Sequence, residues 1–182
     1  MIRPFGLTLC LASAVALLGT GCGSVSEVNQ PAASSSQAAA SSPSATAKAT
    51  AHVGATLTLT DEQVTLTKVI DPATGGDQYT VPDTGKRFVA AVFTIKDTAT
   101  QAGTGDANSN ATLIGSDNQD YTADFDSVSE CTNFSDGEFQ LGPGESTTGC
   151  VVFQVPTAVT VAKVQWSPQS GFSGSFAEWL VP

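Results

Sequence analysis

Glycines, a serine and a cysteine gather near the end of the chain, in the stretch EFQLGPGESTTGCVVFQVP. A phosphate-binding loop would need a lysine and a helix amino terminus after its glycines, and neither follows here. A serine nucleophile would sit in a G-x-S-x-G elbow, whereas Ser146 comes after G-x-G. Pro143 and Gly144 instead fit the two central positions of a type II turn, since glycine tolerates the positive φ that the third position needs. We therefore predict a hairpin at this point, without catalysis.

The other side chains with catalytic potential are scattered. His52 is the one histidine of the chain and lies at the edge of a polar segment, which argues against a serine or cysteine triad and against a zinc site. We interpret five acidic residues as solvated loop charges: Asp124, Asp126, Glu130, Asp136 and Glu138. The alternative for these residues is a carboxylate-based extracellular hydrolase. We expect no enzyme activity and no cofactor.

One polar stretch has the spacing of a calcium-binding loop. Asp106, Asn108 and Asn110 occupy positions one, three and five, and Asp117 then falls at position twelve. Ala111 stands at position six, where a glycine would be wanted, and aspartate is shorter than the usual bidentate glutamate. We interpret the stretch as a polar loop, because Asn, Asp, Gly and Ser favour turns. A calcium-binding envelope protein is the alternative.

The first residues have the order of a secretory signal. Arg3 precedes an apolar block over residues 7–18, which is shorter than the about 20 residues that a membrane-spanning helix needs. The following LLGTGCGS resembles a bacterial lipobox, in which small residues precede a lipidated cysteine, here Cys22; Gly19 departs from the usual leucine. We predict a signal peptide over residues 1–21 and a Cys22 that carries acyl chains such as palmitate. An ordinary secreted protein with a leftover thiol is the alternative.

Composition changes abruptly at this cysteine. Residues 22–50 are rich in Ala and Ser, and such a segment cannot bury enough apolar surface to offset its conformational entropy. We predict a disordered tether there and a folded domain over residues 51–182. Without the signal, which holds Arg3, the chain has six basic against 17 acidic side chains. This excess argues against nucleic acid and against electrostatic docking to anionic lipid, because both need clustered Lys and Arg.

From Ala55 onward the chain alternates apolar and polar residues, which is the period of a half-buried strand. Turn residues separate the strand-like runs ATLTLT, QVTLTKVI, KRFVAAVFTIKDT, YTADF, TGCVVFQV, TVAKVQW and FAEWLV. No convincing helical period with capping residues occurs. We predict an all-β fold, an antiparallel immunoglobulin-like β-sandwich. The central strand should be KRFVAAVFTIKDT, with one inward face formed by Val89, Ala91, Phe93 and Ile95.

Several of these runs carry a family resemblance. The stretches VGATLTL, VTLTKVIDP, GKRFVAAVFTIKDT and LGPGESTTGCVVFQVP, with the final W-L-V-P, resemble a bacterial extracellular domain family of unknown function related to immunoprotective secreted antigens. The resemblance covers nearly all of residues 52–182 and implies a telokin-like, immunoglobulin-like sandwich in a lipoprotein or secreted protein of Gram-positive bacteria. It implies no catalytic residues. Asp97, which follows Lys96, departs from the family pattern, because the family more often has asparagine after this lysine.

Cys131 and Cys150 are the two cysteines left in the domain. An exported chain enters an oxidising compartment, where a cysteine pair without histidine partners more often forms a structural disulfide than a metal site. We predict a disulfide between them that closes a loop of about 20 residues. This disulfide would have a structural role and no part in a chemical reaction.

Binding residues on sandwiches are usually carried by the loops between strands. We favour loops 126–137 and 71–86, because a loop held by a disulfide loses less entropy on binding. Phe134 and Tyr79 would supply apolar contact area there, unless both fold back onto the sandwich. The sequence thus predicts a lipid-anchored module on the extracytoplasmic face of the cell membrane, with release to the cell wall or medium as an alternative. Its partner would be an envelope or extracellular protein or a glycan.

Overall fold

The computed structural model describes residues 47–182. The predicted signal peptide, Cys22 and the tether up to residue 46 lie outside the described residues. Strands make up most of the described chain: β1 Ala47–His52, β2 Thr56–Thr58, β3 Glu62–Ala73, β4 Lys86–Asp97, β5 Gly103–Asp106, β6 Ala111–Gly115, β7 Asp120–Asp124, β8 Glu138–Leu141, β9 Ser146–Pro156, β10 Val161–Trp166 and β11 Ser175–Leu180. The helical turns are α1, Ala107–Asn110, and the 3-10 turn η1, Pro168–Gly171. Neither is a long apolar helix of the kind that could span a bilayer.

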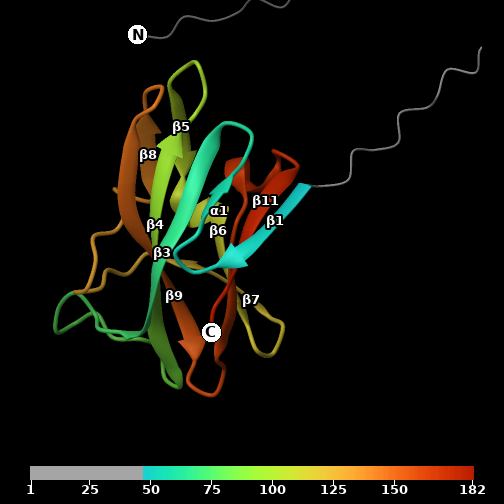
Figure 1. Ribbon diagram of the computed structural model, residues 1–182. Coiled ribbons are helices and arrows are strands. Elements are labelled where there is room, and N and C mark those ends of the chain that lie inside the picture. The colour runs from blue at the N-terminus through green and yellow to red at the C-terminus, as the bar shows by residue number, and fades with distance from the viewer. Residues whose placement is uncertain (1–46) are drawn as a thin grey trace, which may run out of the picture. The chain divides into compact units, whose positions relative to one another are not determined.

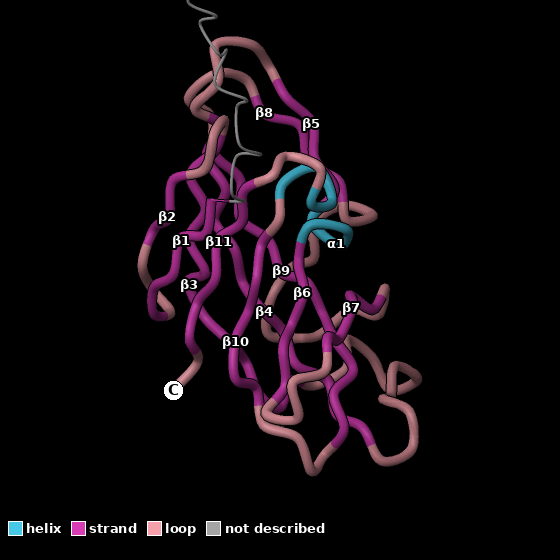
Figure 2. The backbone as a smooth tube through the Cα atoms, turned by 90° about the vertical axis from the view of Figure 1, so that its right-hand side faces the viewer, coloured by secondary structure: helices cyan, strands magenta, loops and turns pink. Residues whose placement is uncertain are grey.

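The strands form one large sheet and one small sheet. Nine strands follow the order β1-β11-β10-β6-β7-β9-β4-β3-β2, while β5 and β8 pair in the second sheet. β7 pairs with both β6 and β9 and so joins two layers, with β3, β4 and β9 in one and β6, β10 and β11 in the other (Figure 1). β5 and β8 lie at one end of this sandwich (Figure 2). The predicted all-β sandwich is confirmed.

The main core lies between the two layers, with β4 at its centre. The inward residues predicted for this strand are fully buried: Val89, Ala91, Phe93 and Ile95. Phe93 packs against two tryptophans of the other layer, with ring centroids 4.9 Å from Trp166 and 6.1 Å from Trp179. The indole N–H of Trp179 donates to the backbone oxygen of Ala55 over 2.8 Å. The polar atom of this buried ring is therefore satisfied.

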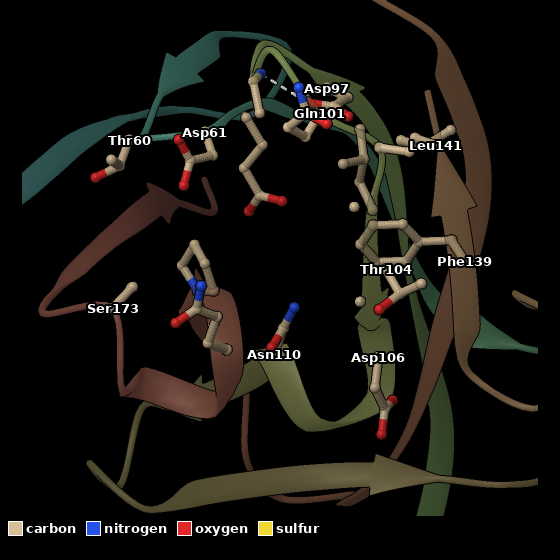
Figure 3. A pocket seen from close by; sticks show the side chains of 18 of the residues that line it. Thr60, Asp61, Asp97, Gln101, Thr104, Asp106, Asn110, Phe139, Leu141 and Ser173 are labelled. Carbon is tan, nitrogen blue, oxygen red and sulfur yellow. Dashed lines mark hydrogen bonds between the residues drawn. The ribbon is translucent and has the colours of Figure 1, made fainter. Parts of the chain in front are cut away.

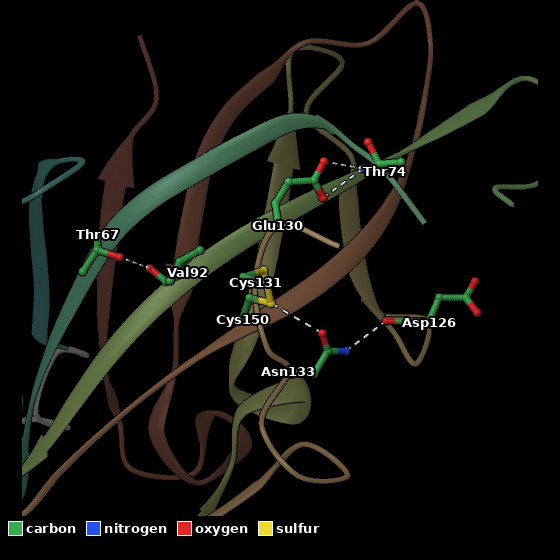
Figure 4. The surroundings of a disulfide bond; sticks show 8 residues. All are labelled: Thr67, Thr74, Val92, Asp126, Glu130, Cys131, Asn133 and Cys150. Carbon is green, nitrogen blue, oxygen red and sulfur yellow. Dashed lines mark hydrogen bonds between the residues drawn. A yellow bond between two sulfur atoms is a disulfide. The ribbon is translucent and has the colours of Figure 1, made fainter. Parts of the chain in front are cut away.

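The outer face of β4 is covered as well. Phe88 and Ala90 point away from the main core and belong to a second apolar cluster with Val128. The predicted disulfide between Cys131 and Cys150 is present, with a Cα–Cα distance of 6.2 Å (Figure 4). It holds the segment that carries Val128 over this face. The disulfide thus closes a second, smaller core on the outside of the sheet.

Hydrogen bonds hold the segment around the disulfide in place. The Glu130 carboxylate accepts the Thr74 N–H over 3.0 and 3.1 Å, and Asn133 Nδ2 donates to the Asp126 backbone oxygen over 2.9 Å (Figure 4). Asn133 Oδ1 also lies 3.4 Å from Cys150 Sγ. That last approach is a contact rather than a hydrogen bond, because a disulfide sulfur carries no hydrogen.

The folded domain begins earlier than composition predicted. β1 starts at Ala47, inside the range assigned to the tether, and pairs in parallel with β11 from Ala47 against Ser175 to His52 against Leu180. Backbone hydrogen bonds to an existing sheet edge need no large apolar side chains, so an Ala- and Thr-rich segment can be added as a strand. The tether prediction is therefore wrong for residues 47–50.

The Pro-Gly turn is present, but the predicted hairpin is wrong. Gly144 has a φ of 81° and the Glu145 N–H donates to the Gly142 oxygen over 2.9 Å, as a type II turn requires. However, β8 pairs with β5, whereas β9 pairs with β4 and β7. The turn therefore carries the chain from one sheet to the other. It is fixed by Asp97, whose N–H donates to the Glu145 oxygen over 3.0 Å and whose oxygen accepts the Gly144 N–H over 3.1 Å.

Candidate functional site

A cavity of about 360 Å³ opens at the end of the sandwich where β5 and β8 lie (Figure 3). Its walls come from the start of β3, the end of β4, the strands β5 and β8, and the turn η1. Asp61, Glu62, Asp97 and Asp106 line it together with Thr60, Thr104, Asn110 and several serines. The described residues that line it include no Lys, Arg, His or Cys. The site is therefore acidic and has no basic counterion in its walls.

Two of these carboxylates are neighbours across paired strands. Glu62 and Asp97 are opposite each other in the antiparallel register of β3 and β4, so their side chains lie on the same face of the sheet. Asp97 is only 6% exposed. Its Oδ1 accepts the Ala99 N–H over 2.7 Å, but its buried Oδ2 has no hydrogen-bond partner among the described residues. A buried carboxylate oxygen without a donor is uncommon in native proteins.

Glu62 is held by the core. Its Oε1 accepts the indole N–H of Trp166 over 2.6 Å. Burial raises the pKa of Glu62 above its ordinary value, and the negative charges of Asp61 and Asp97 raise it further, while the Trp166 hydrogen bond opposes this shift. Glu62 therefore ionises less readily than a solvated glutamate.

The remaining wall of the cavity is apolar. Phe139 directs its ring into the cavity from β8, beside Leu141, and Ile95 lines it from β4 (Figure 3). The ring of Phe139 lies against Gly105 on the paired strand, where an added Cβ would come within 2.3 Å of the ring. A side chain at position 105 would therefore force the Phe139 ring to move. The cavity combines carboxylates on one wall with an aromatic ring on another.

Sequence reasoning missed both Glu62 and Asp97. Each stands at the polar end of a predicted strand run, Glu62 before QVTLTKVI and Asp97 after KRFVAAVFTIK. An antiparallel pairing of these two consecutive runs would have placed the two acids opposite each other. That signal was available, although it depended on the register of the pair.

The acidic residues of the hydrolase alternative do not lie together in this cavity. The Glu130 carboxylate accepts the Thr74 N–H, and Asp124 Oδ2 accepts Gln154 Nε2 over 2.7 Å. Asp136 is exposed just before β8, and Glu138 is exposed as the first residue of β8. Glu130 and Asp124 therefore have structural roles in the described part of the chain.

The calcium alternative is contradicted by the position of its ligands. Asp106 Oδ1 caps α1 by accepting the Asn108 and Ser109 N–H groups, and the Asn110 Oδ1 accepts a backbone N–H from η1. Asp117 instead accepts the Tyr121 hydroxyl in the turn after β6. The whole of β6 separates Asp117 from the others, at about 3.3 Å per residue. In the described residues no three acidic, histidine or cysteine side chains are grouped to hold a metal ion.

The two aromatic candidates have different environments. The predicted loops are neighbours, since the Gly76 N–H donates to the Ser127 oxygen over 2.8 Å. Tyr79 is 82% exposed, as a contact residue should be. Phe134 is only 6% exposed, and its ring covers Gly149, where an added Cβ would lie 2.9 Å from the ring. Phe134 is thus a core residue, and its assignment as a contact residue is wrong.

The fold and the cavity define a small β-sandwich with an acidic pocket at one end. The chain belongs to a family described as a domain of unknown function, DUF4352, which matches residues 51–176. The expectation of a family of unknown function is therefore confirmed. No curated protein matches the chain.

Several solved structures are similar to the chain at low sequence identity. The yjhA protein of Bacillus subtilis is 12% identical with a TM-score of 0.52, over 75% of this chain and 99% of that chain. A candidate lipoprotein of Bacillus subtilis, ycdA, is 13% identical with a TM-score of 0.51, over 69% of this chain and 38% of that chain. The secreted protein MPT63 of Mycobacterium tuberculosis is 17% identical with a TM-score of 0.49, over 72% and 96%. At such identities the likeness concerns the fold alone.

Phe134 and Tyr79 form a matched pair for separating core from surface. Phe134→Ala should lower the free energy of unfolding by about 3–5 kcal/mol, because it opens a cavity against β9. Tyr79→Ala should change it by less than about 0.5 kcal/mol, because the side chain is exposed. Denaturant unfolding of both variants measures the difference. Equal losses in the two variants would contradict the assignment.

Glu62→Gln should stabilise the protein at neutral pH. A raised pKa means that the ionised carboxylate is less favourable in the folded protein than in the unfolded chain. This cost is present above the raised pKa and disappears as the pH falls below the ordinary value of 4.5, where both states are protonated. The amide removes the cost and keeps an oxygen for Trp166. Urea unfolding at neutral pH and at about pH 3 should show the gain only at neutral pH.

The control for this variant is Glu138→Gln, which alters an exposed glutamate of β8. It should show no pH-dependent gain. If Glu62→Gln is less stable than the parent chain at neutral pH, the cost assigned to the buried charge is wrong.

Proposed function

We propose that the protein is an extracytoplasmic binding module, anchored by lipid at Cys22, that holds a small ligand in the end pocket without catalysing a reaction. The observation that carries the binding role is made on Asp97, a residue of the cavity lining. Its buried Oδ2 has no hydrogen-bond partner among the described residues. Leaving a buried acceptor unpaired costs about 1–3 kcal/mol, and more when it is charged. A ligand that donates a hydrogen bond would remove this cost.

A carboxylate-based hydrolase is the second candidate. It is favoured by the raised pKa of Glu62 beside a second carboxylate, which is a pattern of acid and base pairs. Glycosidases, however, place their two carboxylates on either side of the bond that is cleaved. Glu62 and Asp97 are cross-strand neighbours on one wall, and the Ala99 N–H holds one oxygen of Asp97. This arrangement favours a pocket that binds a donor group of the ligand between the two acids over one that hydrolyses a bond of the ligand.

The anchor rests on the sequence LLGTGCGS before and around Cys22. A structural neighbour that is itself a candidate lipoprotein, ycdA, agrees with this assignment. A lipid at Cys22 and a tether of about 25 residues would hold the sandwich off the membrane surface without fixing its orientation. The pocket would then face the cell envelope or the medium.

Replacement of Cys22 tests the anchor. The native protein should fractionate with membranes, and mass spectrometry should find an acylated cysteine as the first residue of the mature chain. Cys22→Ser should move the protein to the soluble extracytoplasmic fraction or the medium, with the same thermal stability. An unmodified chain that begins at another residue would contradict the lipid anchor.

The tryptophan side chains provide a direct test of binding in the pocket. The Trp166 indole N–H donates to Glu62 at the pocket, whereas that of Trp179 donates to Ala55 inside the core. In a spectrum of the ¹⁵N-labelled mature chain with Cys22→Ser, a ligand of the pocket should shift the Trp166 indole signal and leave that of Trp179 in place. The panel should include neutral sugars, amino acids, short amines and short carboxylates. If no compound shifts Trp166, the proposed binding role is wrong.

A further inference from the structure

We infer that the ligand of the end pocket presents a protonated amino group to Asp97 and Glu62 and rests its carbon skeleton against Phe139. This inference depends on the proposed binding role and adds the chemical class of the ligand, an organic ammonium ion. The residues that line the pocket indicate three properties of the ligand: its hydrogen-bonding role, its charge and its size.

The hydrogen-bonding role follows from Asp97. Its side chain is buried, one oxygen is held by the Ala99 N–H over 2.7 Å, and the other has no donor among the described residues. An ionised carboxylate only accepts hydrogen bonds, so the missing partner must be a donor. The backbone of Asp97 is tied to the type II turn by two hydrogen bonds, so the strand cannot easily move to provide one.

The charge of the ligand follows from the lining. Asp61, Glu62, Asp97 and Asp106 contribute carboxylates, and the described walls hold no basic side chain. Lys96 is next to Asp97 in the sequence, but successive residues of a strand point to opposite faces, and it is exposed on the other side. The ion pairs of the described residues use acids elsewhere: Asp71, Asp83 and Glu178. A cation is therefore favoured over a neutral donor, and an anion is excluded.

The size of the pocket favours an organic cation over a metal ion. The cavity of about 360 Å³ falls in the range of small-molecule sites, about 300–1,000 Å³. Part of its wall is apolar, from Ile95, Phe139 and Leu141, which a bare ion would leave without a contact. No three acidic, histidine or cysteine residues in the described range are grouped for a metal. An ammonium group with an alkyl chain would match both kinds of wall.

The cross-strand pair suits an ammonium group in particular. Residues directly opposite in an antiparallel pair have Cβ atoms about 4.5–5.5 Å apart, so Glu62 and Asp97 present two acceptors to one small group. An ammonium group has three donors and can serve both carboxylates at once. Its positive charge would also offset the repulsion between the two acids.

Three compounds with one carbon skeleton test the inference: 1-pentylamine, 1-pentanol and pentanoate. Each is titrated into the ¹⁵N-labelled mature chain with Cys22→Ser while the Trp166 and Trp179 indole signals are followed. Pentylamine should shift Trp166 in a saturable way, pentanol should bind more weakly, and pentanoate should not bind. Asp97→Asn should weaken pentylamine binding roughly tenfold to a hundredfold, the effect of losing one charge-assisted hydrogen bond.

The variants are chosen to keep the fold. An amide at position 97 retains an oxygen for the Ala99 N–H, and Glu62→Gln retains one for Trp166, so both should stay folded and both should bind pentylamine less tightly. Glu138→Gln, outside the pocket, should bind as the parent does. Three results would each contradict the ammonium assignment: equally tight binding of pentanol or pentanoate, a shift of the Trp166 signal by calcium chloride alone, or normal pentylamine binding by both pocket variants. In each case a pocket ligand of another class would still be consistent with the data. If neither these compounds nor the wider panel shift Trp166, the binding role fails with it.

Discussion

The burial of β4 on both faces is the constraint on which the rest of this structure depends. Its inner face packs against Trp166 and Trp179 of the opposite layer, and its outer face, with Phe88 and Ala90, has to be covered as well. A fully buried side chain of the size of Val, Ile or Phe stabilises the fold by about 1.5–3 kcal/mol. The long connection between β7 and β8 supplies the outer cover, and the disulfide holds it there.

The pocket exists because this buried strand ends inside the fold. β4 ends at Asp97, at the edge of the core and opposite Glu62. The type II turn before β9 forms hydrogen bonds with both the N–H and the backbone oxygen of Asp97. A carboxylate at the end of a rigid central strand is positioned more firmly than one on a loop. The two backbone hydrogen bonds hold Asp97 in place, while its Oδ2 has no hydrogen-bond partner among the described residues. An unpaired buried acceptor is costly, which under the proposed binding role favours a ligand that donates a hydrogen bond.

Polar and aromatic side chains near the loops have different environments. At the pocket end, Glu62, Asp97 and Asn110 are half-buried or buried. Phe134 is also buried, over Gly149 and with its ring centroid 5.9 Å from that of Phe139, whereas Tyr79 and Phe125 project into solvent. Aromatic residues in similar loop sequences are therefore exposed or buried according to the residues that surround them in the fold. A glycine on a paired strand leaves room for a ring, and the ring fills it because unfilled apolar space is costly.

Local patterns by themselves determined much of this protein. Period-two alternation predicted most strands and the inward face of β4, the Pro-Gly pair predicted the type II turn, and the cysteine count predicted the disulfide. Tertiary structure alone decided that β1 joins the sheet, that β8 pairs with β5 instead of β9, and that Glu62 meets Asp97. The physical reason is that strand pairing uses backbone groups common to nearly all residues, so the choice of partner and register depends on how distant segments bury their apolar faces together.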